Sequence, residues 1–354
     1  RIVPQPILRP SSIGRKPISS PPRPPPPPPP KPPPPRDEPK PPPREDDKPP
    51  PPDLAPVRFR RAGRGAPCRH HAGHAEAPDL PALRAAVAAL KSDGKTLALV
   101  PTMGALHDGH MALVEEARRH GRHVVVSIFV NPRQFGPNED LDAYPRREAK
   151  DAQLLQAAGV DILWAPSVEV MYPAGYATNI RVSGVSEGLD GAARPGHFDG
   201  VATVVTKLFN QVAPDVAIFG EKDYQQLAVI RRMVADTNLD IEIIGMPTQR
   251  AEDGLALSSR NAYLSEQERK DALALPRALG EAKRQIEKGE PVEAALAKAI
   301  ATLATHGFDP IDYVTLCDAD SLEPIATLDR PARLLGAAKL GKTRLIDNIA
   351  VDLV

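Results

Sequence analysis

Short apolar runs alternate with longer amphipathic segments along most of this chain, and this alternation restricts the possible fold most strongly. The apolar runs span residues 96–102, 124–130, 161–165, 215–220 and 241–245. They are largely continuous in apolar residues, as in strands that are buried on both faces of a sheet. Segments with helical spacing precede and separate them, beginning with residues 78–90. This order predicts an α/β fold with a Rossmann-like parallel sheet that is covered by helices on both faces.

Polar loops follow three of these runs, after Val100, Val130 and Phe219. In an open parallel sheet the carboxyl ends of neighbouring strands meet at one edge, and ligands bind beyond that edge. We therefore expect these loops to form a single ligand-binding site.

The first of these loops has the sequence Pro101-Thr-Met-Gly-Ala-Leu-His-Asp-Gly-His, and helical spacing begins at Met111. A strand, a glycine-bearing turn and a helix N-terminus favour anion binding, because free N–H groups and the helix dipole point at the ligand. The imidazoles of His107 and His110 suit a phosphate that gains charge in a transition state. Two histidines that merely cap a turn are the alternative, which the surrounding strand, glycines and helix make the weaker interpretation.

The pattern changes after Arg250. Two amphipathic helices are expected within residues 265–288 (interrupted near Pro276) and 291–306, followed by strands at 311–316, 332–338 and 343–350. We therefore predict a Rossmann-like domain at residues 78–249 and a smaller C-terminal α+β domain at residues 250–354.

Residues 1–77 form a proline-rich basic tail in this division. Of the 43 prolines in the chain, 26 lie within the first 56 residues. A segment with so few large apolar side chains is expected to be disordered or to form polyproline II. Its PxxP repeats suit an SH3 or WW ligand, although a spacer without catalytic consequence is the favoured interpretation. Cys68, His70, His71 and His74 raise a weaker possibility of a metal site.

The neutral total charge of the chain hides an uneven distribution. Residues 1–76 contain 15 Lys and Arg against 7 Asp and Glu, a net charge of +8, so the remainder carries −8. An acidic globule is a poor nucleic-acid binder. No apolar run approaches membrane-spanning length, and Cys68 and Cys317 suggest no disulfide framework, so we expect a cytoplasmic protein with neither a nucleic-acid nor a membrane partner.

Five motifs together resemble the pantothenate synthetase (pantoate–β-alanine ligase) family of the HxGH nucleotidyltransferase superfamily. One is the histidine loop; the others are Phe129-Val-Asn-Pro-Arg-Gln-Phe, Arg194-Pro-Gly-His-Phe-Asp-Gly-Val, Gly220-Glu-Lys-Asp-Tyr-Gln-Gln and Leu257-Ser-Ser-Arg-Asn. An HxGH motif alone is shared by many nucleotidyltransferases and class I tRNA synthetases, but five long motifs in the family's order are highly specific. The resemblance runs from about Pro78 onward and leaves out the tail.

The resemblance implies ATP-dependent ligation of (R)-pantoate and β-alanine to pantothenate through a pantoyl-adenylate, with release of AMP and pyrophosphate. It implies ATP contacts from Met103, Gly104, His107, His110, Gly220, Glu221, Lys222, Asp223, Gln249, Leu257, Ser258, Ser259 and Arg260. Catalytic roles are implied for His107, His110, Lys222 and Arg260, with His110 as the proton donor of the family. Ser258, Ser259 and Arg260 resemble a KMSKS-like loop that closes on the β- and γ-phosphates.

Contacts with pantoate and β-alanine are implied for Gln134 and Gln226, with Asn131 and Arg194 as secondary contacts. Gln249 departs from the family pattern, which usually has an apolar residue beside the adenine. Mg²⁺ should accompany ATP because it neutralises the phosphates. The sequence does not identify its ligands, and Asp151 is only a weak candidate. The family also implies a homodimer.

Two other functions stay open at this point. One is a nucleotidyltransferase that acts on a phosphorylated substrate, although Gln134 and Gln226 replace the basic cluster that such a substrate needs. The other is a partner-binding protein that works through its proline-rich tail.

Overall fold

The computed structural model of the chain describes residues 75–92, 94–137 and 139–353. The predictions for residues 1–74, including disorder, the PxxP motifs and the cysteine–histidine cluster, lie outside this part of the chain. The proposed domain boundaries near residues 77 and 249 stay predictions.

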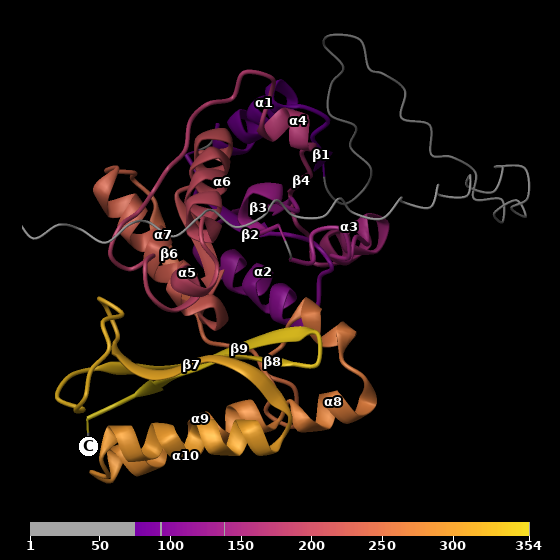
Figure 1. The fold of residues 1–354 in the computed structure, drawn as a ribbon. Helices are drawn as coiled ribbons and strands as arrows, with labels where there is room; N and C mark the ends of the chain where they lie inside the picture. The colour runs from indigo at the N-terminus through magenta and orange to yellow at the C-terminus, as the bar shows by residue number, and fades with distance from the viewer. Residues whose placement is uncertain (1–74, 93, 138, 354) are drawn as a thin grey trace, which may run out of the picture. The chain divides into compact units, whose positions relative to one another are not determined.

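Among the described residues, six strands form one sheet in the order β1-β4-β3-β2-β5-β6, and all their pairings are parallel (Figure 1). The strands are β1 (Ala75–Glu76), β2 (Leu97–Thr102), β3 (His123–Ile128), β4 (Ile162–Trp164), β5 (Val216–Gly220) and β6 (Glu242–Met246). The chain moves outward from β2 to β4 and then returns to place β5 on the other side of β2. The carboxyl ends of β2 and β5 therefore flank the switch point at which such sheets bind ligands.

Helices cover both faces of this sheet, as the alternation of strands and helices predicted. One face packs against α1 (Leu80–Lys91), α6 (His197–Val212) and α7 (Tyr224–Asp236), and the other against α2 (Asp108–His120) and α3 (Glu148–Ala157). Successive residues of β2 separate the two cores: Leu97 and Leu99 belong to the first, Ala98 and Val100 to the second. The predicted α/β fold class is therefore confirmed.

Two helices begin earlier than their apolar periodicity indicated. The expected start of α2 was Met111, but the helix begins at Asp108, so His110 lies in its first turn. Similarly, the apolar spacing of residues 201–211 predicts a helix that starts at Val201, but α6 begins at His197, directly after Gly196 in the left-handed region with φ of 82°. The segment between β4 and α6 also contains the short helices α4 (Val168–Met171) and α5 (Leu189–Ala193).

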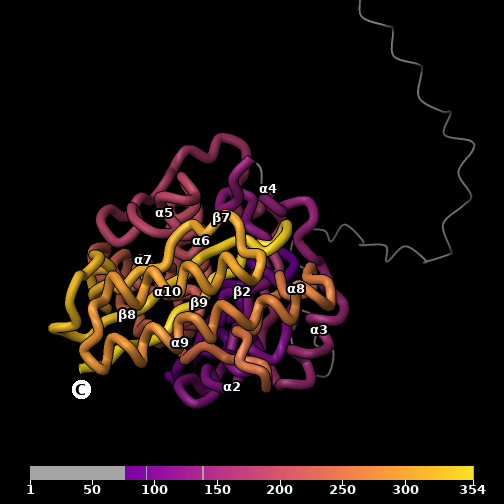
Figure 2. Tube along the Cα trace, turned by 60° about the horizontal axis from the view of Figure 1, so that its bottom comes forward, coloured from indigo at the N-terminus to yellow at the C-terminus, as the bar shows by residue number. Residues whose placement is uncertain are grey.

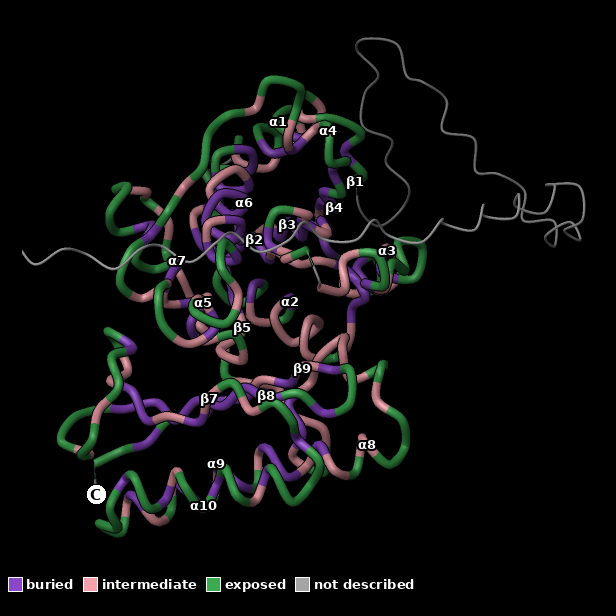
Figure 3. Tube along the Cα trace, in the orientation of Figure 1, coloured by how far each residue is buried: buried purple, intermediate pink, exposed green. Residues whose placement is uncertain are grey.

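The C-terminal region forms an antiparallel sheet of three strands within the described residues, β7 (Phe308–Asp318), β8 (Ala332–Leu340) and β9 (Thr343–Val351). Helices α9 (Ala274–Glu287) and α10 (Val292–Thr305) run side by side and pack on one face of this sheet (Figure 2). Buried and exposed residues alternate along both helices, as amphipathic helices require (Figure 3). The predicted interruption near Pro276 separates α9 from α8 (Glu266–Asp271), and Pro276 lies in the first turn of α9.

The other face of the small sheet meets the parallel-sheet domain. Strand β9 contacts the 3₁₀ turns η3 (Glu221–Asp223) and η4 (Ser259–Tyr263), which carry residues of two of the family motifs. None of the helices in the described part of the chain has the length and apolar character needed to cross a membrane.

Candidate active site

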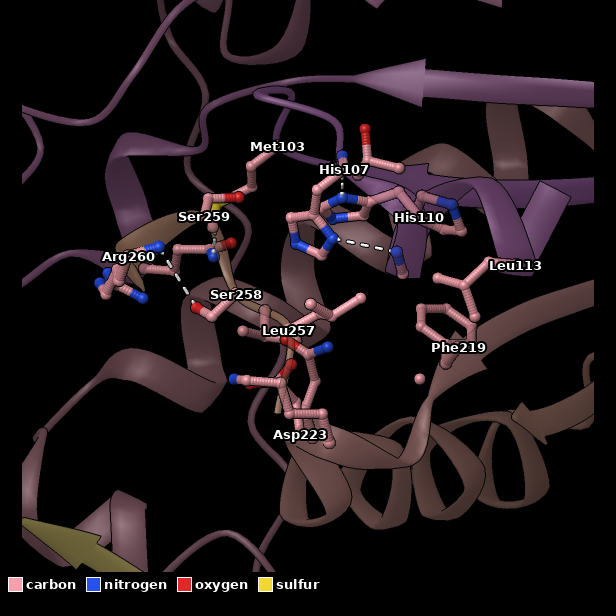
Figure 4. Close-up of a pocket in the computed structure, with 18 of the residues that line it drawn as sticks. Met103, His107, His110, Leu113, Phe219, Asp223, Leu257, Ser258, Ser259 and Arg260 are labelled. Carbon is pink, nitrogen blue, oxygen red and sulfur yellow. Dashed lines mark hydrogen bonds and ion pairs between the residues drawn. The ribbon is translucent and has the colours of Figure 1, made fainter. Parts of the chain in front are cut away.

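The two histidines of the HxGH motif build the N-terminus of α2. His107 is the N-cap, and its Nδ1 accepts a hydrogen bond from the Gly109 N–H at 3.1 Å. His110 returns the interaction, because its Nδ1 accepts from the His107 N–H at 3.3 Å. The ring centroids lie 4.1 Å apart, and Figure 4 shows the two rings side by side at the pocket. A Cβ on Gly109 would lie 2.9 Å from Cε1 of His107, so only glycine leaves the ring this position.

These contacts determine the protonation of both imidazoles. A backbone N–H can only donate, so both Nδ1 atoms are acceptors and each neutral ring carries its proton on Nε2. Burial, His107 and Lys222 together lower the pKa of His110 to about 3. Burial and Lys222 also lower the pKa of His107. Near neutral pH the site therefore offers two neutral Nε2–H donors at a helix N-terminus.

The turn between β2 and α2 is held in place by Asp151 of α3. This carboxylate is 1% exposed, and its two oxygens accept from the N–H groups of Ala105 at 2.7 Å and Leu106 at 3.0 Å. Gly104 and Ala105 both have positive φ, 84° and 51°. Asp151, raised above as a possible Mg²⁺ ligand, thus supports an unusual backbone turn with both carboxylate oxygens. The described residues contain no cluster of three or more His, Cys, Asp or Glu side chains arranged to hold a metal.

One cavity of about 230 Å³ brings together most of the predicted site residues (Figure 4). Its lining includes Met103, His107, His110, Gln134, Arg194, Gly220, Lys222, Asp223, Gln226, Gln249, Leu257, Ser258, Ser259 and Arg260. The loops after β2, β3 and β5 therefore do converge, as their positions at strand carboxyl ends indicated. A second cavity, of about 800 Å³, shares Arg194, Lys222 and Arg260 and extends towards β9. The roles of the individual residues stay predictions.

Three predicted site residues do not line the smaller cavity. Gly104 packs behind it, where a Cβ would lie 3.1 Å from Cγ2 of Ile128. The carboxylate of Glu221 turns away and pairs with Arg333 at 2.8 Å. Asn131 is 1% exposed and orients the Gln134 side chain, because Nδ2 of Asn131 donates a hydrogen bond to Oε1 of Gln134 at 3.1 Å.

Gln134 is held from several directions, which fixes its carboxamide in the cavity. Asn131 also donates to the Gly200 carbonyl at 3.1 Å and accepts from the Tyr172 hydroxyl at 2.8 Å. Nε2 of Gln134 points to the sulfur of Met103 at 3.0 Å. A Cβ on Gly200 would lie 2.3 Å from the Arg133 carbonyl oxygen, so α6 approaches this loop as closely as only glycine allows.

His197 is a site residue that sequence reasoning missed, although it lies in the quoted Arg-Pro-Gly-His-Phe motif. Its Nδ1 lies 2.8 Å from the Gln134 carbonyl oxygen, which can only accept, so Nδ1 carries the proton. Its Nε2 then accepts from Nη1 of Arg194 at 3.0 Å. Burial and the neighbouring Arg194 lower the pKa of His197 to about 4, which keeps this ring neutral.

Two acidic residues hold the arginines of the site. Arg194 Nε donates to Glu139 at 2.7 Å, and Arg260 donates to both oxygens of Asp140 at 3.0 and 2.8 Å. Burial alone would raise the pKa of each carboxyl, but the hydrogen-bonded guanidinium outweighs burial and lowers it. Both carboxylates are therefore ionised near neutral pH.

The Ser258–Arg260 segment lies against the histidine loop. Ser259 Oγ donates to the Ala105 carbonyl at 3.3 Å, and Ser258 Oγ accepts from the Arg260 N–H at 3.3 Å. Tyr144, another lining residue that sequence reasoning missed, has its ring centroid 5.8 Å from the Arg260 guanidinium.

The wall near β6 contains Gln249 and Thr248. The Gln249 carboxamide donates to the Pro247 carbonyl at 3.0 Å, and the backbone carbonyl of Gln249 accepts from the Leu257 N–H at 2.9 Å. Thr248 lines the cavity, and its buried hydroxyl has no hydrogen-bond partner within the described residues. It is therefore a polar group available to a bound molecule.

Comparison with known proteins gives a consistent result. The family model described as pantoate-beta-alanine ligase matches residues 77–350. A pantothenate synthetase of Rhizorhabdus wittichii is 70% identical over 270 residues, covering 76% of this chain and 96% of that protein. One from Sphingopyxis alaskensis is 60% identical, covering 77% and 98%.

Solved structures agree in fold. The pantothenate synthetase from Thermus thermophilus superimposes with a TM-score of 0.74 at 48% identity, covering 78% of this chain and 99% of that one. A pantoate-beta-alanine ligase from Francisella tularensis, solved with β,γ-ATP and β-alanine, has a TM-score of 0.65 at 36% identity, covering 77% and 96%.

Proposed function

The chain belongs to the pantoate–β-alanine ligase family, and from this premise we infer that it catalyses the ATP-dependent ligation of (R)-pantoate and β-alanine to pantothenate. The observation that carries this inference is the family match over residues 77–350, which includes every residue that lines the smaller cavity.

The reaction proceeds in two steps through a pantoyl-adenylate. A carboxylate does not form an amide directly, so an oxygen of the pantoate carboxylate first attacks the α-phosphorus of ATP. The bond to pyrophosphate breaks, and a mixed anhydride forms. The amine of β-alanine then attacks the acyl carbon, loses a proton and displaces AMP. Neither step needs a nucleophile from the protein, so positioning and fixed donors supply the catalysis.

The phosphates bind at the N-terminus of α2. The Nε2–H groups of His107 and His110 donate to phosphate oxygens, and Lys222 adds a positive charge close enough to depress both histidine pKa values. The neutral imidazole of His110 acts here as a hydrogen-bond donor to developing charge, which suits its pKa of about 3 better than transfer of a proton from an imidazolium. Ser258, Ser259 and Arg260 hold the β- and γ-phosphates.

The ribose and adenine bind on the side of β5 and β6. Asp223 occupies the N-cap position of α7 but makes no capping hydrogen bond with its side chain, so its carboxylate is available to the ribose hydroxyls. The adenine lies along Thr248 and Gln249, with Gly220 and Leu257 beside it. The departure of Gln249 from the apolar family pattern leaves backbone contacts in place.

Pantoate binds at the loop after β3. Gln134 and Gln226 supply neutral amides for its hydroxyls and carboxylate, while Met103, Phe129 and Val201 line the same cavity and suit its two methyl groups. Arg194 lies where the cavities meet and suits the carboxylate of β-alanine.

Mg²⁺ enters with ATP as part of the substrate and is bound mainly by the phosphates and water. We also propose that the protein is a homodimer and that it acts in the cytoplasm. Light scattering of the purified full chain would test the homodimer.

The decisive measurement uses the two half-reactions. Pantoate and ATP with Mg²⁺ should release pyrophosphate before β-alanine is added, and β-alanine should then release AMP and pantothenate. Absence of pyrophosphate without β-alanine would exclude the two-step route. Turnover with a phosphorylated co-substrate in place of pantoate would favour the nucleotidyltransferase alternative.

A further inference from the structure

The C-terminal sheet contacts the candidate site through Asn348, although Asn348 does not line the smaller cavity. This side chain lies on β9, is 3% exposed and faces the turn that carries Lys222. Its Nδ2 donates to the carbonyl oxygens of Glu221 and Lys222, both at 2.9 Å. A single carboxamide therefore holds two consecutive peptide units of the turn.

Arg333 of β8 fixes the orientation of Asn348. Nε of Arg333 donates to Oδ1 of Asn348 at 2.7 Å, which leaves Nδ2 of that amide to face the turn. Nη2 of Arg333 donates to the Glu221 carboxylate at 2.8 Å, and the guanidinium lies 4.0 Å from the ring centroid of Tyr224. The Lys222 turn is thus held through both its backbone and its flanking side chains.

The neighbouring Asp347 holds the second phosphate-binding segment. It is 3% exposed, and its two oxygens accept from Arg250 at 2.7 and 2.8 Å. Arg250 also donates to the Gly254 carbonyl at 3.1 Å and pairs across a β-bridge with Ala256, next to the Leu257–Arg260 segment. Asp347 additionally accepts from the backbone N–H of Asn348 at 2.7 Å, which joins the two sets of contacts.

We propose that Asp347 and Asn348 are positioning residues for adenylation. Together they form a brace, the Asp347–Asn348 pair, that places Lys222 and the Ser258–Arg260 segment relative to each other. This proposal rests on the proposed function and assigns to the C-terminal domain a part in catalysis that does not involve contact with ATP or pantoate.

The physical reason is the cost of loosening a buried turn. Removal of the Asn348 amide leaves the carbonyls of Glu221 and Lys222 without the donor that a 3%-exposed side chain supplies. The turn then relaxes, and Nζ of Lys222 moves with it. A displacement of about 1 Å in a catalytic group can cost about 100-fold in rate.

The test is a double-mutant cycle in the full chain, read by pyrophosphate release from saturating pantoate and ATP. We expect Asn348→Ala to lower kcat by about 10- to 100-fold while the KM for pantoate changes less than about 3-fold. In a Lys222→Ala background the same substitution should cost less than about 3-fold more, because Asn348 acts through Lys222. Tyr313→Phe is the matched control: it removes a contact between the C-terminal sheet and helix α5, the 2.8 Å hydrogen bond from Tyr313 of β7 to Asp190, without touching the Lys222 turn.

Three outcomes would overturn the proposal: an Asn348→Ala rate equal to that of Tyr313→Phe, an undiminished effect in the Lys222→Ala background, or a loss confined to the KM for pantoate. If Asn348→Ala does not fold, judged by its thermal transition, Arg333→Gln enters the same cycle with the same expectations. A wild-type chain that releases no pyrophosphate would instead refute the proposed function.

Discussion

At the scale of single residues, the site depends on imidazoles that stay neutral. Asp108 and Asp223 raise the pKa of His107, but burial and Lys222 outweigh them and lower it, and burial, His107 and Lys222 lower the pKa of His110. Their backbone contacts leave both Nε2–H groups as donors. In the proposed mechanism the two histidines therefore act as uncharged hydrogen-bond donors.

His110 is the residue whose loss should affect adenylation most. His110→Ala removes a donor at the developing charge, so the rate of pyrophosphate release should fall by about 10²- to 10⁴-fold. Stopped-flow kinetics of the first half-reaction measure this rate of pyrophosphate release. His110→Gln, which keeps an N–H donor, should retain more activity than the alanine variant. An unchanged rate in His110→Ala would remove this residue from the mechanism.

The pKa of His197 gives a stability prediction with a defined sign. Its pKa is about 4 in the folded chain and about 6.5 when unfolded, so the unfolded chain takes up the proton first as the pH falls. This contribution to stability is nearly complete at pH 7 and is lost towards pH 4, by about 2 kcal/mol between pH 7 and pH 5.

Denaturant unfolding at pH 7, 6 and 5 measures this loss. His197→Asn keeps an amide donor towards the Gln134 carbonyl but does not titrate, so its unfolding free energy should vary less over this range. His110 contributes with the same sign but is common to both proteins and cancels in the difference. An unfolding free energy that falls equally with pH in the wild-type and His197→Asn proteins would contradict the assignment of a neutral His197.

In the proposed mechanism Asp140 competes with the phosphates of ATP for Arg260. Its pair with Arg260 is about one-quarter exposed, so it contributes about 1 kcal/mol, which converts to about 5-fold in affinity. Asp140→Asn should therefore lower the KM for ATP by about 3- to 5-fold. Steady-state kinetics at fixed pantoate measure this change, and a higher KM would show that Asp140 orients Arg260 for ATP instead.

At the scale of elements, most strands and helices follow from apolar periodicity, but their ends do not. The parallel strands and the convergence of three loops were predicted correctly because burial on both faces leaves a clear apolar signal. Strand β1 was missed because two residues carry no periodicity. The starts of α2 and α6 were missed because the caps are a histidine ring and a left-handed glycine rather than the usual serine or aspartate.

Contacts between distant segments were the other limit of sequence reasoning. Nothing in the local pattern of β9 separates Asn348 from an ordinary strand residue, and its partner Lys222 lies 126 positions away. The hydrogen bond between the Glu221 carboxylate and Arg333 was likewise not visible in the sequence, where the resemblance implied only an ATP contact for Glu221.

The close approach of α6 to the loop after β3 yields an element-scale prediction. Gly200→Ala places a Cβ 2.3 Å from the Arg133 carbonyl oxygen, so the loop that carries Gln134 must move. We expect the KM for pantoate to rise by about 10-fold, since overpacking of this kind costs about 1–3 kcal/mol. The KM for ATP should change little. Gly188→Ala serves as the control, because its added Cβ meets no atom within 4 Å, and an equal effect in both variants would refute the explanation.

At the scale of the whole molecule, the residues that line the smaller cavity all lie between positions 101 and 260, and the family match begins at residue 77. A truncated chain that begins at residue 75 keeps β1, which pairs with β4 at the edge of the sheet. We expect it to retain kcat/KM within about 2-fold, because no residue placed near the substrates is removed. This is tested by comparing kcat/KM of the truncated and full chains in an assay that follows pyrophosphate release. Loss of activity would give the proline-rich segment a functional role and revive the partner-binding hypothesis.

The position of β9 in the chain has a consequence for how the enzyme is made. Because synthesis runs from the N-terminus, the Lys222 turn and the Ser258–Arg260 segment leave the ribosome before Asp347 and Asn348 exist. A nascent chain that has completed its parallel sheet already displays the two histidines, yet it lacks the strand that ties its phosphate-binding segments together. If Asp347 and Asn348 position these segments as proposed, such a nascent chain adenylates more slowly than the finished enzyme, and a product that terminates before residue 347 would carry the motifs with reduced activity.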